Sequence, residues 1–188
     1  SFATCGDCFK DSRDGQSYPT VEIGEQCWMA KNMNIGERVA DSDLTTHQRA
    51  GIQKICYDNL ESNCDTYGGL YNWAEAVNGE QTASGAIGTA TDFNKKCATD
   101  GSGHTQGICP DGWHVPSKTE LYIGSGSSGW NWIMGGLRFY TGGFMRLGSV
   151  GYCWSSSENS ESSAWFNDPG RQTTEGKSYG FSVRCLLN

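Results

Sequence analysis

Cysteine is the residue type with the most obvious chemistry in this sequence. Nine cysteines are spread over 188 residues, and Cys5 and Cys8 alone have the CxxC spacing of a zinc or redox motif. A zinc site would need a second such pair, and a thioredoxin-type motif would open a helix after a strand instead of standing at the start of the chain. We therefore predict a disulfide framework that forms in an oxidising compartment.

The odd number of cysteines leaves at least one thiol unpaired, and Cys153 is our candidate for it. Cys56 and Cys64 flank a turn-rich stretch, and we predict a disulfide between them. Spacing does not decide the remaining pairs. The alternatives are Cys27 with Cys5 or Cys8, and Cys109 with Cys97 or Cys185.

The other residues that could do chemistry do not form a catalytic set. His114 lies in the block Gly-Trp-His-Val-Pro, and we interpret it as a structural histidine with a hydrogen-bond partner. The serines at 155–157 lack the Gly-x-Ser-x-Gly elbow of a serine hydrolase. No nucleophile stands beside a base and an orienting acid. We predict that the chain is not an enzyme and has no catalytic residue and no cofactor.

Aromatic residues in the last third of the chain favour binding over catalysis. Phe139 with Tyr140 and Trp165 with Phe166 are adjacent pairs, and neighbours in a strand point to opposite faces. One member of each pair should therefore face outward, and exposed aromatic and arginine side chains dominate many interfaces. The residues that we predict to contact a ligand are Phe139, Tyr140, Phe144, Met145, Arg146, Tyr152, Trp165, Phe166 and Asn167.

Local patterns predict the elements that must position these residues. Alternation predicts strands near residues 18–23 and 27–30, and the spacing of apolar residues predicts a helix over 70–77. Ser117 and Glu120 have the spacing of a capping box, so a second short helix should follow.

Gly- and Ser-rich stretches separate these elements. We predict loops over residues 34–53 and 78–108 and a flexible linker over 124–129, followed by a meander of short antiparallel strands. The expected architecture is α+β and loop-rich, with two short helices and small antiparallel sheets stabilised by disulfides.

Length and composition limit the kinds of partner. The chain suits one domain. Its net charge of −7 disfavours nucleic acid, which requires a basic surface. No apolar run approaches the roughly 20 residues that cross a bilayer, so we expect no membrane insertion. Twenty-six glycines and 12% aromatic residues indicate a core built from rings within a loop-rich fold.

Several sequence blocks are distinctive: Gln26-Cys27-Trp28-Met29-Ala30, Cys56-Tyr57-Asp58-Asn59, Tyr67-Gly68-Gly69-Leu70-Tyr71-Asn72-Trp73, Cys109-Pro110-Asp111-Gly112-Trp113-His114-Val115-Pro116, Trp154-Ser155-Ser156-Ser157 and Gly180-Phe181-Ser182-Val183-Arg184-Cys185. These blocks resemble the Fibrobacter succinogenes major paralogous domain and come in the order of that family. The resemblance implies a C-type-lectin-like fold for a single domain over residues 1–188, in a secreted or surface-anchored bacterial protein. The stretch after Glu120 is shorter than the helix and loop usual in the family. The resemblance also places Trp28, Trp73, Trp113 and Trp154 in the core.

Residues 137–185 also resemble the variable region of proteins diversified by retroelements, which rewrite selected codons at a lectin-fold surface. The resemblance implies a scaffold over residues 1–136 and a variable ligand-binding region over 137–185. A template asparagine codon can be rewritten to cysteine, which offers a reason for an unpaired Cys153.

Residues 165–168 are similar to the Trp-Asn-Asp element that helps to hold calcium in sugar-binding lectins, but Phe166 interrupts it. Calcium needs six to eight oxygen ligands, which the sequence does not identify. We predict no metal site.

These observations favour a monomeric ligand-binding module that is extracellular, on a bacterial cell surface or on a phage particle, and that binds a protein or cell-surface ligand. One alternative is a structural or assembly subunit of a cell-surface or fibre-tip complex. A third hypothesis is a formylglycine-generating-type enzyme, because the implied fold is related to such enzymes. These enzymes use a pair of thiols, which Cys153 and Cys185 could provide. Cys185, however, belongs to a sequence block shared with the family and is expected in a disulfide.

Overall fold

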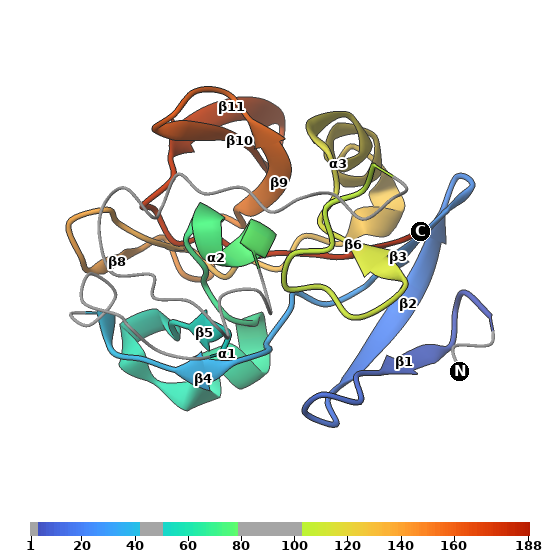
Figure 1. Ribbon diagram of the computed structural model, residues 1–188, viewed down its shortest axis with the longest axis horizontal. Coiled ribbons are helices and arrows are strands. Elements are labelled where there is room, and N and C mark those ends of the chain that lie inside the picture. Colours follow the sequence, from blue (N-terminus) through green and yellow to red (C-terminus); the bar gives the residue numbers. More distant parts are fainter. Residues whose placement is uncertain (1–3, 42–50, 79–102) are drawn as a thin grey trace.

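The computed structural model describes residues 4–41, 51–78 and 103–188 (Figure 1). Short strands predominate and the helices are brief, so the fold is α+β, as expected. The helices are α1 (Glu61–Tyr67), α2 (Trp73–Asn78) and α3 (Lys118–Ser125), with 3₁₀ turns η2 (Tyr57–Asn59) and η5 (Ser128–Trp130). The strands are β1 (Cys8–Lys10), β2 (Ser17–Ile23), β3 (Gln26–Met29), β4 (Glu37–Arg38), β5 (Gln53–Lys54), β6 (Trp113–His114), β7 (Leu137–Arg138), β8 (Phe144–Met145), β9 (Cys153–Glu158), β10 (Ser163–Asp168), β11 (Arg171–Gly176) and β12 (Leu186–Leu187).

One sheet joins the two ends of the chain. Its strands lie in the order β1-β2-β3-β12-β6. Leu186 of β12 pairs with Trp28 of β3 on one side and with His114 of β6 on the other. The last strand therefore lies inside the sheet that the first strands begin, and both chain ends lie on the same side of Figure 1.

A second, three-stranded sheet carries much of the predicted ligand region. Its order is β11-β10-β9, with antiparallel pairing throughout. It stands at the top of Figure 1, and α3 packs against β9 and β10. The described residues also contain two small strand pairs: β7 and β8 form an antiparallel hairpin, and β4 and β5 are parallel.

Two of the three α-helices in the described residues were predicted. In α3 the capping box is present: Ser117 Oγ accepts from the Glu120 amide at 3.3 Å, and the Glu120 carboxylate accepts from the Ser117 amide at 2.8 Å. The unexpected helix, α1, begins between Cys56 and Cys64, where turns were predicted. The η2 turn before it holds Asp58 in the left-handed region, so the sequence there is typical of a turn and masks the helix that follows.

The Gly/Ser stretch over 124–129 is not a linker, contrary to expectation. Helix α3 continues to Ser125, and η5 follows at Ser128. Gly124 is buried, and a Cβ atom at this position would lie 2.6 Å from the Trp28 ring. The glycine is therefore needed for close packing of α3, and composition alone was misleading.

Aromatic side chains build the core. The ring of Phe181 is surrounded by others, with centroid distances of 5.1 Å to Tyr152, 4.4 Å to Trp154 and 4.7 Å to Phe166. The four tryptophans expected in the core are confirmed there, each at most 1% exposed: Trp28, Trp73, Trp113 and Trp154.

Three disulfides form among the described residues, and the predicted bond between Cys56 and Cys64 is one of them. Cys153 is free and buried, and Cys8 is free and exposed. The other two disulfides are Cys5–Cys27 and Cys109–Cys185. Cys97, one alternative partner for Cys109, lies outside the described residues.

No helix in the described part of the chain is long and apolar enough to cross a membrane.

Candidate functional site

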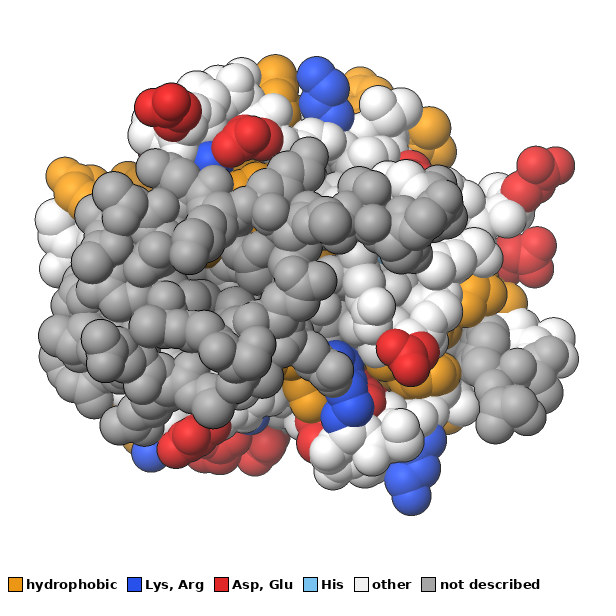
Figure 2. Space-filling model, in the orientation of Figure 1, with side chains coloured by type: hydrophobic (Ala, Val, Ile, Leu, Met, Phe, Trp, Pro, Cys, Tyr) orange, Lys and Arg blue, Asp and Glu red, His pale blue; other side chains and the backbone are white. Residues whose placement is uncertain are grey.

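The predicted ligand residues differ in exposure. Tyr140 and Met145 are 51% and 48% exposed, and Arg146 is also exposed. Hydrophobic side chains reach the surface at the left edge of Figure 2, on the side where β8 lies in Figure 1. Three others are half-buried: Phe139, Phe144 and Trp165.

Three predicted ligand residues are buried. Tyr152 is 6% exposed, and Phe166 and Asn167 are 2% exposed. We expected exposed side chains at these positions. Alternation along β10 turns Trp165 outward and Phe166 into the core. Asn167 is covered by α3, because its Nδ2 donates to Ser125 Oγ at 2.8 Å.

A hollow of about 510 Å³ joins distant parts of the predicted region. One side is formed by residues between 146 and 152, which follow β8, and the other by residues 168–171, the turn between β10 and β11. Arg146 and Tyr152 were predicted as ligand residues and line this hollow. Asp168 and Arg171 were missed, because turn residues without rings carry no binding signal in the sequence.

Two arginines set the charge of this hollow. Arg171 Nε donates to Asp168 Oδ2 at 2.7 Å, so these two charges compensate each other. Arg146 makes no ion pair with any residue that the structure describes. Its backbone φ of 68° lies in the left-handed region, which costs a non-glycine residue about 1 kcal/mol. Burial raises the pKa of the Tyr152 phenol, so this group remains neutral at the wall of the hollow.

Two contacting rings, exposed Tyr140 and half-buried Tyr179, lie next to the β7–β8 hairpin. The ring centroids of Tyr140 and Tyr179 are 5.5 Å apart. Asp41 holds the hairpin, since its carboxylate pairs with Arg138 and accepts from the Gly143 amide at 2.6 Å. Tyr140 is therefore presented from a turn that is fixed at both sides.

A larger hollow, of about 850 Å³, lies between β1 and residues 110–113. Free Cys8 and Trp113 are among the residues that line it. None of the predicted ligand residues does so, and we do not place the ligand site there.

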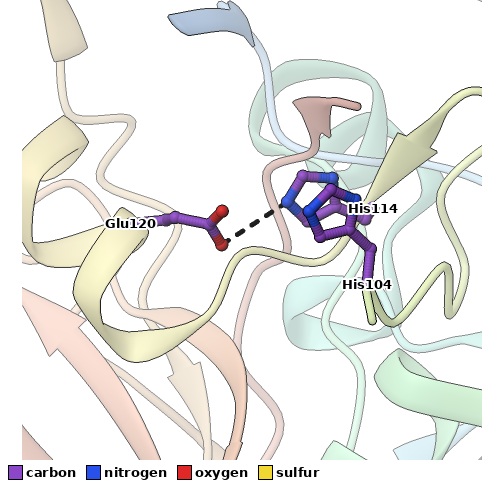
Figure 3. A group of neighbouring side chains, drawn as sticks. All are labelled: His104, His114 and Glu120. Atoms are coloured by element: carbon purple, nitrogen blue, oxygen red, sulfur yellow. Dashed lines mark ion pairs between the residues drawn. The ribbon is translucent and has the colours of Figure 1, made fainter. Parts of the chain in front are cut away.

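A third feature is a cluster of His104, His114 and Glu120, whose donor atoms lie within 4.8 Å of one another. Figure 3 shows the Glu120 carboxylate, from the first turn of α3, facing two stacked imidazole rings. The ring centroids are 4.0 Å apart and the planes differ by 9°. His114 Nε2 lies 3.4 Å from Glu120 Oε2, and interaction with His114 lowers the pKa of Glu120 to about 2.

This cluster was not predicted from the sequence. His114 was expected to be structural and Glu120 to be a capping residue, and no role was predicted for His104. The three side chains come from three segments, which a bridge between Thr105 and Val115 and the start of α3 bring together. A capping glutamate six residues after a histidine is the one local signal, and it says nothing of His104.

A family model described as the Fibrobacter succinogenes major domain matches residues 21–123, more than half of the chain. The protein belongs to this family. The Fibrobacter succinogenes major domain match runs from β2 to α3 and includes His104, His114 and Glu120. The hollow at Tyr152 and the β7–β8 hairpin lie beyond its end. Searches among curated proteins and among solved structures found no match.

Proposed function

We propose that this protein is a ligand-binding module of a bacterial surface or a phage particle, and that it binds a protein or cell-surface ligand through residues after 137. The observation that carries the proposal is that the β7–β8 hairpin and the residue after it expose Tyr140, Met145 and Arg146, and that Arg146 also lines the hollow at Tyr152. Large hydrophobic side chains gathered at a surface mark interaction sites more often than isolated ones do.

The chemistry of the group fits recognition. Tyr140 and Tyr179 offer rigid rings of the kind that dominate binding energy at interfaces. Arg146 has no acidic partner among the described residues, so a ligand with an acidic group would compensate its charge. The left-handed backbone of Arg146 is a local strain of the kind that gathers at binding sites.

We further propose a C-type-lectin-like fold with residues 137–185 as a variable region. Two observations support this. The final strand, β12, lies in the same sheet as the first three strands. Trp154 and Phe181 lie in the core, whereas Tyr140 and Met145 are exposed to solvent. Outward positions of this kind can change without opening a cavity. The three disulfides favour an oxidising, extracellular location.

Binding of the fluorescently labelled chain to a panel of intact bacterial cells tests the ligand surface. We expect Tyr140→Ala and Arg146→Ala to weaken binding at least tenfold, which corresponds to about 1.4 kcal/mol. The Tm should change little, because exposed substitutions rarely alter stability by more than about 0.5 kcal/mol. Tyr122→Ala is the matched control, since Tyr122 is 61% exposed on α3, outside the proposed surface. Equal loss with Tyr122→Ala, or no loss with either variant, contradicts the proposal.

Sequencing the gene across one natural population tests the variable region. Substitutions should concentrate at exposed positions such as Tyr140, Met145 and Arg146, at adenine-derived codons. Trp154 and Phe181 should be spared, because they fill the core. A sparse, even distribution would contradict diversification and would leave a fixed binding module.

A further inference from the structure

We propose that His104, His114 and Glu120 form a binding site for a divalent transition-metal ion, with zinc as the ion that their chemistry fits best. The site lies before the ligand region in the sequence and does not depend on the proposed function. Two imidazole nitrogens and one carboxylate oxygen are a donor set that zinc uses with one position left open. Imidazole suits the neighbouring transition metals as well, whereas calcium and magnesium prefer oxygen ligands alone.

The hydrogen bonding of His114 leaves one ring nitrogen that needs a positive partner. Asn188 Oδ1 lies 2.7 Å from Nδ1, and an amide oxygen only accepts, so Nδ1 carries the proton. Nε2 is buried, makes no hydrogen bond with any residue that the structure describes, and lies 3.4 Å from Glu120 Oε2. A nitrogen lone pair that faces a carboxylate in a buried site is unfavourable unless a proton or a metal ion lies between them.

A metal ion accounts for more of this cluster than a proton does. A proton on His114 would satisfy only the contact between His114 and Glu120. If His104 were protonated as well, two imidazolium rings stacked 4.0 Å apart would repel each other. A dication attracts all three side chains at once and accepts a lone pair from each.

The surroundings orient the ligands before a metal arrives. A metal-bound histidine usually donates a hydrogen bond from the N–H of its second ring nitrogen to an oxygen, and Asn188 Oδ1 is that acceptor for His114. Glu120 Oε2 accepts from the Ser117 amide at 2.8 Å, which fixes the carboxylate at the start of α3. The Asn188 amide donates to the Gly112 carbonyl at 2.9 Å, which ties Asn188 to the chain next to β6.

Binding requires a small movement of His104. Donor atoms of the cluster lie within 4.8 Å, whereas two ligands of tetrahedral zinc are roughly 3.4 Å apart. Nearly parallel stacked rings cannot both direct a lone pair at one point, so one ring must turn out of the stack. His104 is the less buried of the two and is the ring that turns. The Glu120 side chain is 27% exposed, so metal and water can enter from its side.

Calorimetric titration of the untagged full chain with Zn²⁺, after alkylation of accessible thiols, tests the site. We expect one Zn²⁺ per chain. Glu120→Gln and His104→Ala each remove a ligand and should weaken the affinity at least a hundredfold. Asn188→Ala keeps all three ligands and should weaken it about tenfold to a hundredfold, without a change in the Tm of the metal-free chain. Ca²⁺ should not compete.

Two controls keep the outcome decisive. His47→Ala removes the third histidine of the chain and should leave the affinity unchanged. Co²⁺ should give a visible absorption band of tetrahedral nitrogen and oxygen ligation in the unaltered protein, a readout that needs no variant. The absence of saturable Zn²⁺ binding and of the Co²⁺ band overturns the proposal and assigns the contact of His114 with Glu120 to a shared proton. Binding that survives both Glu120→Gln and His104→Ala also overturns it.

Discussion

The five-stranded and three-stranded sheets are held together in different ways. Two disulfides, Cys5–Cys27 and Cys109–Cys185, tie β3 and the segment before β12 to other parts of the chain. The sheet of β9, β10 and β11 contains one cysteine, Cys153. Burial raises the pKa of its free thiol to about 11. The second sheet is stabilised instead by rings that meet at Phe181.

This difference shows how a small protein can combine a fixed frame with a surface that is open to change. Disulfides restrict the unfolded chain and do not depend on close fit of neighbouring side chains. A ring cluster depends on close fit, but only on the inner face of its sheet. Phe166 contributes to that inner face, while its neighbour Trp165 lies on the outer one, where Lys118 Nζ is 4.4 Å from its ring. Outer positions can therefore vary while the inner face stays constant.

The largest expected effect concerns the ring cluster. Phe181→Ala should lower the free energy of unfolding by about 3–5 kcal/mol, because it leaves a cavity among buried rings. Urea unfolding measures the change. Trp165→Ala, on the outer face, should cost about 1 kcal/mol or less, which is the scale of one exposed cation–π contact. Similar losses for the two variants would remove the distinction between inner and outer faces.

The stability of the five-stranded sheet should depend on the disulfide between Cys109 and Cys185. Replacing Cys109 and Cys185 together with Ala removes a buried bond that spans 76 residues of sequence. We expect a loss of about 2–5 kcal/mol in the free energy of unfolding, since the unfolded chain gains freedom. Cys8→Ser, at an exposed free thiol, is the control and should change stability by less than about 0.5 kcal/mol. A double variant as stable as Cys8→Ser would show that the five-stranded sheet does not need this covalent link.

A smaller effect is expected at the start of α3. Ser117→Ala removes the side-chain cap of the helix and should cost about 1 kcal/mol. The Tm and the urea midpoint should both fall. Thr119→Ala, at an exposed position in the same turn, should leave stability nearly unchanged or slightly raised. If Ser117→Ala is equally neutral, packing of α3 on β9 and β10 alone holds the helix.

Several features follow from residues close together in the sequence. Ser117 and Glu120 predicted the start of α3, and alternation predicted β2, because capping and strand pairing follow short-range rules. The bond between Cys56 and Cys64 was predicted for the same reason, since it closes a short turn-rich stretch. The four buried tryptophans were expected from the family resemblance, and their size and apolar character suit the core.

The remaining features depend on where distant segments meet. Cys27 could have paired with Cys5 or Cys8 as far as spacing shows, and Gly124 resembled part of a linker until it was placed against Trp28. The hollow at Tyr152 exists because the β10–β11 turn lies beside the residues that follow β8.

The chain by itself therefore determined several local elements, such as β2 and α3, together with the disulfide character and the aromatic core. Only the tertiary structure decided which polar side chains meet. His104, His114 and Glu120 come together because a bridge joins the segment of His104 to that of Val115 and α3 begins directly after it. Capping and alternation are written in adjacent residues, whereas such a meeting depends on the packing of the whole chain, which no short spacing encodes.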